Sequence, residues 1–263
     1  MKKLLISAAF SLALAGAASA ETIKMAVTTS FANSGLAEVL LPAIQEDLGI
    51  DIELLIVGSG QALKLGEAGD VDAVLSHAKA AEEEYIAAGH FTHRQEIMFN
   101  DFVVNGPSAD PAGTASADSA AAAFAAIAAA ESPFVSRGDD SGTHKAELRI
   151  WQAAGIEPSG EWYRPVGQGM GAALNTAAGM DAYIMSDRAT WLAFENKGDL
   201  ALLFSGDPVM FNVYAFLPVN PEKGDFIQAE AVKRVEQWLT GDRGRALIDG
   251  FRVAGEQVFT AIR

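Results

Sequence analysis

Residues 136–144, with the sequence SRGDDSGTH, combine residue types that bind small anions. The stretch follows the apolar residues 133–135 and precedes a helical pattern at 145–154, so it lies where a strand is expected to pass into a helix. The first N–H groups of a helix have no partner inside it, and the helix dipole places partial positive charge there. Such a turn can hold an anion through backbone donors, and Arg137 adds a fixed positive charge. We therefore predict an oxyanion cradle at this position.

The cradle has two other interpretations. A solvated turn capped by Asp140 or Ser141 would explain part of the stretch, but not the arginine beside a buried strand. Asp139, Ser141 and His144 could be read as a hydrolytic triad. However, Ser141 and His144 are three residues apart at a helix start, and the sequence contains no G-x-S-x-G elbow. No catalytic residue is predicted, and the protein is not expected to be an enzyme.

Hydroxyl or glycine residues also follow other predicted strands. In open α/β sheets, ligands bind beyond the carboxyl ends of the strands, where several loops meet. Each loop alone has an ordinary explanation as a turn or a helix start, but their recurrence in both halves of the chain favours a shared site. The predicted ligand-binding residues are Thr28, Thr29, Ser30, Ser59, Arg137, Ser141, Gly142, Thr143, Gly169 and Met170.

Strand-like and helix-like segments alternate along the chain, which is typical of a mostly parallel sheet flanked by helices. A first β/α series ends near residue 88, and a second begins at residue 134. Extended segments at 100–105 and 213–219 are expected to join the two. The predicted fold is an α/β clamshell of two lobes. Residues 21–103 and 214–263 are assigned to lobe 1, and residues 104–213 to lobe 2.

The first predicted helix shows how local signals set the boundaries. Residues 28–33 are expected to form a loop, and Asn33 or Ser34 would cap the helix that follows. Gly49 is expected to end that helix. Pro42 lies inside the helical pattern, and it predicts a kink or a break because proline lacks a backbone N–H and clashes with the preceding turn.

Residues 1–20 have the pattern of a secretory signal peptide: Lys2 and Lys3, an apolar stretch, and the small residues Ala18, Ser19 and Ala20. A membrane anchor is the alternative, but the apolar stretch is shorter than the ~20 residues that a span requires. We therefore expect a periplasmic protein. The chain contains no cysteine, so its stability must come from a packed core rather than from disulfides.

The charge balance is strongly acidic, with 34 Asp and Glu against 19 Lys and Arg. This argues against nucleic acid or an anionic membrane as a partner. A small anion is compatible with it, because salt screens charges beyond about 8 Å. Glu84, His90, His93 and Glu96 form a weak zinc pattern that surface histidines explain better. Neither a metal cation nor a cofactor is predicted.

The sequence after residue 20 resembles the periplasmic solute-binding components of tungstate ABC transporters, within the type II periplasmic-binding-protein fold. The resemblance covers nearly the whole chain, and it is carried by residues 28–30, 33–36, 57–64, 100–104, 136–145, 167–171 and 187–188. It implies a monomer that delivers tungstate, or molybdate, to the permease and ATPase subunits of an ABC importer. Val27 departs from the family, which usually has a threonine there.

Arg137, Asp139, Ser141, Gly142 and Thr143 also resemble the Arg-x-Asp-x-Ser-Gly-Thr motif of phosphate-binding proteins. In that family the aspartate accepts a proton from the bound phosphate. Tungstate carries no proton at neutral pH, so an inward-pointing carboxylate would repel it. A tungstate site therefore predicts that Asp139 turns away or pairs with Arg137. The alternatives are a phosphate-type binding protein and an oxyanion sensor without a transport role. Arg188 is interpreted either as an ion pair between the lobes or as a ligand.

Overall fold

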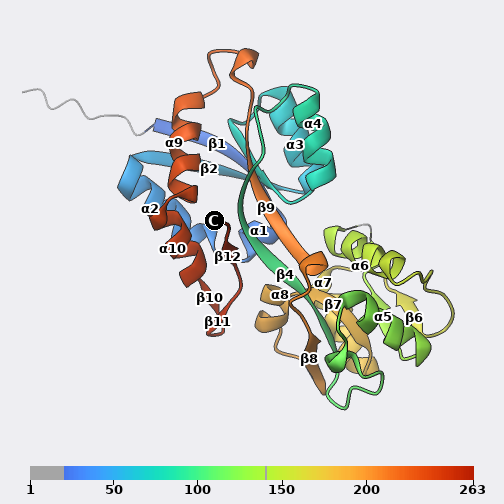
Figure 1. Cartoon of the computed structure of the whole chain (residues 1–263). Coiled ribbons are helices and arrows are strands. Elements are labelled where there is room, and N and C mark those ends of the chain that lie inside the picture. The colour runs from blue at the N-terminus through green and yellow to red at the C-terminus, as the bar shows by residue number, and fades with distance from the viewer. Residues whose placement is uncertain (1–20, 140) are drawn as a thin grey trace, which may run out of the picture.

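The computed structural model describes residues 21–139 and 141–263, and it has two lobes (Figure 1). The predicted signal peptide and Asp140 lie outside the described residues. Lobe 1, in the upper left of the view, contains the N-terminal β/α series and the C-terminal helices, whereas lobe 2, in the lower right, contains α5 to α8. The strands β4 and β9 run between them. Among the described residues, no helix is long and apolar enough to cross a bilayer.

Lobe 1 begins with the alternation that the sequence predicts. Its elements are β1 (Glu21–Thr28), α1 (Thr29–Asn33), α2 (Ala37–Leu48), β2 (Ile50–Val57), α3 (Ser59–Ala68), β3 (Ala73–Ser76) and α4 (Lys79–Ala87). β1 pairs in parallel with both β2 and β3. Thr28 pairs with Val57, and Val27 with Leu75, so the three carboxyl ends lie level at one edge.

Two details of the first helical region differ from expectation. Residues 29–33 form the short helix α1 rather than a loop, because the Thr28 side chain caps it by accepting a hydrogen bond from the N–H of Phe31 at 3.4 Å. Pro42 lies inside α2 without breaking it, since Leu40, Ala43 and Ile44 hold the helix against the core. Neither Asn33 nor Ser34 caps α2, which starts after Leu36 without a side-chain cap. Gly49 ends α2 in the left-handed conformation, as predicted.

Lobe 2 repeats the β/α pattern on a smaller scale. It contains η1 (Thr114–Ser116), α5 (Ala120–Ala129), β5 (Phe134–Ser136), α6 (Gly142–Ala153), β6 (Tyr163–Pro165), α7 (Met170–Met180), β7 (Tyr183–Asp187), α8 (Arg188–Ala193), β8 (Leu200–Phe204) and η2 (Pro208–Met210). β5 pairs in parallel with β6 and β7. The sequence interpretation missed α8 and β8, because a helix of six residues and a strand of five carry little periodic signal.

Two antiparallel strands join the lobes: β4 (Gln95–Pro107) and β9 (Phe211–Pro218). β4 pairs with β9 from Gln95 to Asp101, and then with β7 from Phe102 to Asn105. The sheet of lobe 1 therefore continues into that of lobe 2, and in the described part of the chain ten strands form one sheet. The predicted lobe boundaries fall inside β4 and near the start of β9; the boundaries themselves stay a prediction.

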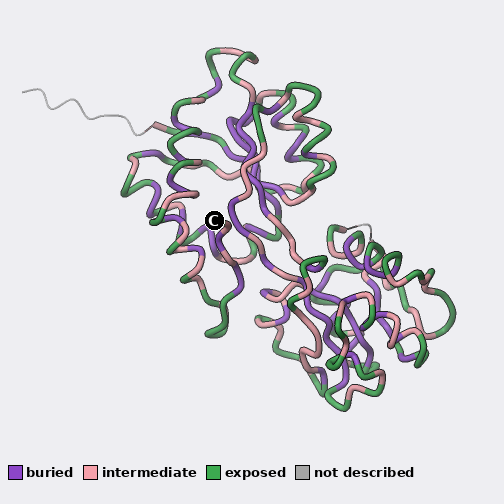
Figure 2. The backbone as a smooth tube through the Cα atoms, viewed as in Figure 1, coloured by how far each residue is buried: buried purple, intermediate pink, exposed green. Residues whose placement is uncertain are grey.

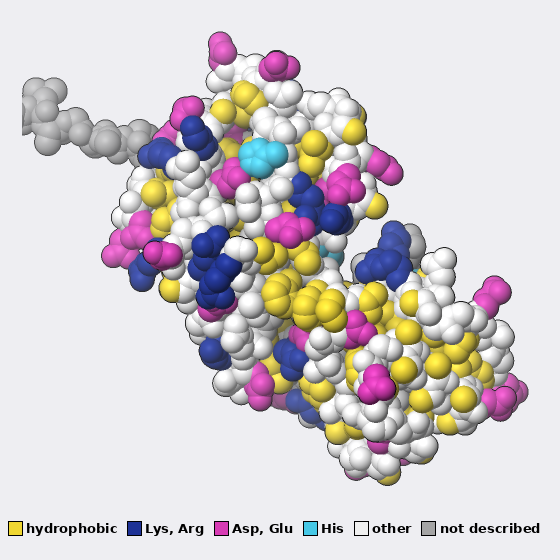
Figure 3. All heavy atoms as spheres, viewed as in Figure 1, with side chains coloured by type: hydrophobic (Ala, Val, Ile, Leu, Met, Phe, Trp, Pro, Cys, Tyr) yellow, Lys and Arg dark blue, Asp and Glu magenta, His cyan; other side chains and the backbone are white. Residues whose placement is uncertain are grey.

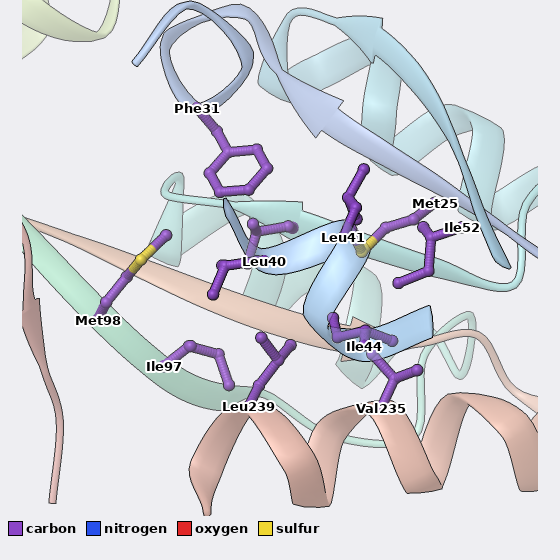
Figure 4. Close-up of a pocket in the computed structure, with 11 residues that line it drawn as sticks. Met25, Phe31, Leu40, Leu41, Ile44, Ile52, Ile97, Met98, Val235 and Leu239 are labelled. Atoms are coloured by element: carbon purple, nitrogen blue, oxygen red, sulfur yellow. The ribbon is translucent and has the colours of Figure 1, made fainter. Parts of the chain in front are cut away.

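The C-terminal segment returns to lobe 1 and completes its core. It consists of η3 (Pro221–Lys223), α9 (Ala229–Thr240), α10 (Asp242–Gly250), the hairpin β10 (Arg252–Val253) and β11 (Glu256–Gln257), and β12 (Thr260–Ala261). β12 pairs with β4, and α9 packs Val235 and Leu239 against α2 and β4 around a small apolar cavity of about 10 Å³ (Figure 4). Phe31 of α1 lies at one end of this cavity and thereby anchors the turn that carries Thr29 and Ser30.

Both lobes have their own buried cores, and burial follows the strands through the centre of each (Figure 2). In lobe 2, the core is rich in aromatic rings: Phe124, Phe134 and Trp151 lie within 4.5–5.5 Å of one another, measured between ring centroids. Phe124 and Ile127 of the alanine-rich helix are fully buried, as the sequence stripe predicts. These two cores fix the loops that face each other between the lobes.

Candidate oxyanion-binding cleft

A cleft of about 450 Å³ lies between the lobes. Figure 3 shows a notch between the two lobes on one face of the molecule, with Lys or Arg side chains on its lobe 2 side. The lining comes from α1, the predicted cradle, the start of α7, the helix α8 and the β10 strand: Thr29, Ser30, Asn33, Ser34, Arg137, Thr143, Met170, Gly171, Asp187, Ala189, Thr190, Ala193 and Val253. Five of the predicted site residues are among them, and they come from both lobes.

Ser30 is the centre of a hydroxyl network on the lobe 1 side. Its Oγ lies 3.1 Å from Thr28 Oγ1, 3.0 Å from the Tyr214 hydroxyl and 3.2 Å from His77 Nε2. Thr28 is buried and supports the turn from behind, while Thr29 and Ser30 are exposed to the cleft. A hydroxyl can donate one hydrogen bond and accept two. The Ser30 hydroxyl is therefore held in place by neighbours from three separate segments.

His77 and Tyr214 were not predicted as part of this network. Burial lowers the pKa of His77 to about 4, so its ring is neutral at physiological pH. Burial also raises the pKa of the Tyr214 hydroxyl above its ordinary value. Both groups thus contact Ser30 as neutral dipoles. His77 could have been found from its place directly after a predicted strand, whereas Tyr214 lies 184 residues from Ser30 and gives no local signal.

The cradle in lobe 2 has the geometry of a capped helix start. Ser141 caps α6, with its Oγ accepting from the N–H of His144 at 3.3 Å. Arg137 donates through Nε to the carbonyl of Gln168 at 3.0 Å and to Asp139 Oδ2 at 3.1 Å, and its Nη2 also bonds Asp139. The Ser141 N–H donates to the other oxygen of Asp139.

Asp139 therefore pairs with Arg137, one of the two arrangements expected of a site for a proton-free oxyanion. Burial alone would raise the pKa of Asp139, but the hydrogen bonds from Ser141 and Arg137 and the charge of Arg137 together hold it below its usual value. Arg137 and the Ser141 N–H occupy three of the roughly four acceptor sites of this carboxylate. This arrangement does not match the role that the aspartate has in the phosphate-type motif.

Several donors in the cradle remain available to a ligand. Within the described residues, Arg137 Nη1 and the N–H groups of Gly142 and Thr143 have no recorded hydrogen-bond acceptor. The same holds, in that part of the chain, for Met170 and Gly171 at the start of α7, which has no side-chain cap. Met170 is buried and belongs to the lining of the cleft. These groups could together hold an anion through neutral donors and one arginine.

Other predicted residues lie beside the cleft rather than in its lining. Gly142 and Gly169 directly precede the lining residues Thr143 and Met170, and Ser141 stands two residues before Thr143. Ser59 begins α3 and is half-buried, but it is not among the lining residues. Arg188 forms a two-pronged ion pair with Asp101, at 2.7 and 2.6 Å, which joins α8 to β4. This pair decides between the two interpretations of Arg188 in favour of the ion pair.

The contacts also show the partners of two histidines and of Asp187. The histidines of the weak zinc pattern have different partners, since His93 bonds Glu236 at 2.7 Å and His90 approaches Glu67 at 3.4 Å. No group of three metal-ligating side chains occurs among the described residues. Asp187, which was missed together with α8, lines the cleft, but its carboxylate accepts from the N–H and the hydroxyl of Thr190 at 2.8 and 2.7 Å.

The chain is similar to proteins of one family. Residues 15–243 match the model of the PBP superfamily domain. The putative ABC transporter anion-binding protein of Haloferax volcanii is 41% identical over 249 residues, which cover 93% of this chain and 73% of that protein. The tungstate-binding protein TupA of Peptoclostridium acidaminophilum is 41% identical over 243 residues, covering 91% and 85%. The structure of TupA from Desulfovibrio alaskensis G20 superposes with a TM-score of 0.88 at 40% identity, covering 92% of this chain and 99% of that one.

Proposed function

The chain belongs to the PBP superfamily and, within it, to the tungstate-binding proteins, and on that premise we propose that it captures tungstate for an ABC importer. It is a solute-binding protein rather than an enzyme. Molybdate has the same tetrahedral shape and charge and is the expected competitor. The permease and ATPase subunits are the proposed partners, and the periplasm, reached through the signal peptide at residues 1–20, is the proposed location. We propose that it acts there as a monomer.

The proposed site uses donors from both lobes. Thr29 and Ser30 would bind from lobe 1, and Arg137, Gly142, Thr143 and the start of α7 from lobe 2. Thr28 and Ser141 would hold these turns in shape, and Ser59 and Gly169 would bind at the margin of the site. The site lies between lobes that we divide within β4 and near the start of β9. Hydrogen bonds to a charged group contribute about 1.5–3 kcal/mol each, so six of them can offset desolvation of the dianion and still leave tight binding.

The pairing of Arg137 with Asp139 is the observation that carries this proposal. It gives the cradle a fixed positive group while it occupies the carboxylate that a protonated oxyanion would need. Such a cradle favours an oxyanion without protons. Tungstate, molybdate and sulfate are in that state at neutral pH, whereas phosphate carries one or two protons. The pairing therefore separates tungstate from phosphate, and the size of the cleft must separate it from sulfate.

Calorimetry on the protein without residues 1–20 tests the proposal. Tungstate should bind far more tightly than phosphate or sulfate; equal or tighter binding of phosphate would contradict it. Arg137→Ala should weaken tungstate binding by at least about 1.5 kcal/mol, roughly tenfold. The matched control is Arg164→Ala, which removes an exposed arginine of the same lobe and changes the net charge equally. Unchanged affinity in the Arg137 variant would remove this residue from the site.

A further inference from the structure

His77 follows β3 and stands on a rigid base in lobe 1. Its ring centroid lies 4.9 Å from that of Tyr214, and its Nε2 lies 3.2 Å from Ser30 Oγ. The next residue, Ala78, donates its N–H to Glu82 Oε1 at 2.7 Å. Glu82 is fully buried and paired with Arg94 at 2.6 Å. The buried Glu82 therefore fixes the loop that carries His77. The His77 ring cannot shift without disturbing its contacts with Tyr214 and Ser30.

The other side of the His77 ring faces lobe 2, where it meets the first residue of α6. A Cβ on Gly142 would lie 3.3 Å from His77 Cε1 and 3.9 Å from Nδ1. Carbon atoms in optimal contact are about 3.5–4.0 Å apart, so a methyl group would be too close to the ring. Gly142 does not have a positive φ, and its backbone would accept alanine. The space taken by His77, rather than the backbone conformation, explains the need for glycine.

The charge state of His77 allows its ring to lie close to the start of α6. The start of α6 carries the positive end of the helix dipole, which would repel an imidazolium. Burial keeps the ring neutral near pH 7 by lowering its pKa to about 4, so the ring can lie against the helix start without that penalty. A single neutral ring thus contacts the Ser30 turn of one lobe and closely approaches the start of α6 in the other.

We propose that the contact between His77 and Gly142 is the stop that ends closure of the cleft, which makes His77 a positioning residue for the bound oxyanion. The inference rests on the proposed function of the cleft. Hydrogen bonds weaken steeply once donor and acceptor move beyond about 3.2 Å. The thickness of the ring sets how far the Ser30 hydroxyl stands from the N–H groups of α6, and therefore whether one anion can reach both.

A set of substitutions isolates this contact. Gly142→Ala should weaken tungstate binding by at least about tenfold, as expected when one methyl group overpacks a fitted contact. In the His77→Asn background, which lacks the Cε1 atom, the same change should cost less than about threefold. In the His77→Phe background, which keeps a ring atom at that place but loses the bond to Ser30, the penalty should remain at least about tenfold. Each affinity is measured by calorimetry, with thermal unfolding as a check on folding.

Gly179→Ala is the matched control, because Gly179 lies inside α7 of the same lobe and nothing lies within 4 Å of its added Cβ. It should bind tungstate like the wild type. Equal penalties for Gly142→Ala in the wild-type and His77→Asn backgrounds would overturn the inference, as would no penalty at all. Either of these two outcomes can be measured only if the wild-type chain binds tungstate. A wild-type chain that binds no oxyanion would instead overturn the proposed function, and the inference with it.

Discussion

Each lobe buries one glutamate behind its side of the cleft, and the two carboxyl groups are compensated in different ways. In lobe 1, Glu82 accepts hydrogen bonds from Arg94 and from the N–H of Ala78, so a full countercharge holds the loop that carries His77. In lobe 2, Glu147 of α6 accepts from Trp151 Nε1 at 3.1 Å and from the Tyr163 hydroxyl at 2.8 Å. Both of these donors are neutral.

The difference shows what a buried carboxyl group needs. An ion pair offsets the loss of hydration, but it makes the stability of lobe 1 depend on two charges being present together. Neutral donors offset it only in part, so burial raises the pKa of Glu147 to about 7. Glu147 is therefore protonated in slightly acidic solution and then adds no negative charge near the cradle. Lobe 1 has a fixed support, whereas the support of lobe 2 changes its charge near neutral pH.

The largest effect is expected from breaking the ion pair in lobe 1. Arg94→Met should lower the free energy of unfolding by about 3–5 kcal/mol, because it leaves Glu82 buried without a countercharge. Urea denaturation at pH 7 measures the change. Arg94→Met combined with Glu82→Gln should recover part of the loss, since the glutamine carbonyl can still accept from Ala78. A loss below about 1 kcal/mol in the single variant would show that the pair does not support lobe 1 in this way.

Removing the charge of Glu147 should raise the free energy of unfolding above neutral pH, by less than Arg94→Met lowers it. The pKa of Glu147 rises from 4.5 to about 7 on folding, so between these values the folded state holds a proton that the unfolded state has lost. The free energy of unfolding of the wild type should therefore fall as the pH rises through this window, by roughly 3 kcal/mol in total. Glu147→Gln, which stays neutral, should remove this loss.

The measurement is urea denaturation of both proteins between pH 4 and pH 8. At pH 8 the Glu147→Gln variant should be the more stable, and at pH 4 the two proteins should be nearly equal. Glu82→Gln serves as the comparison: the same substitution should destabilise lobe 1, because it leaves Arg94 without the countercharge of Glu82. If both glutamine variants moved stability in the same direction at pH 8, the contrast between the lobes would be wrong.

The difference between the charged partner of Glu82 and the neutral partners of Glu147 could be only partly predicted from the sequence. Most of the strands and the passage from β5 into α6 follow from local patterns and were confirmed. The binding role of the hydroxyl turns and of the cradle stays a prediction. Glu82 is one of three consecutive glutamates, and nothing local distinguishes the buried one from its neighbours. Its burial depends on Arg94, which enters from the next strand region. Trp151 stands four residues after Glu147, so their contact on one helix face could have been anticipated.

In the cleft, too, some residues could be predicted from the sequence around them, whereas others are brought in by distant segments. Thr29, Ser30, Arg137 and Thr143 were found because each follows a predicted strand. Tyr214 reaches Ser30 from a strand near the end of the chain, and the α8 wall is a helix of six residues. Packing between distant segments decides such contacts, and no periodic pattern records it. The requirement for glycine at position 142 likewise depends on a ring in the other lobe.

The smallest expected effect, from removing one neutral donor, tests how the lobe 2 carboxyl group is held. Tyr163→Phe removes the hydroxyl that bonds Glu147 at 2.8 Å. At pH 5 the lost bond is one between neutral groups and should cost about 1 kcal/mol, whereas at pH 8.5 it is a bond to a carboxylate and should cost about 2 kcal/mol. In the Glu147→Gln background the cost should be the same at both values of pH, because glutamine does not ionise. Urea denaturation of the four proteins measures these differences. A pH-independent cost in the single variant would mean that the hydroxyl does not help to hold the charged form, and that the contrast with the ion pair of lobe 1 rests on burial alone.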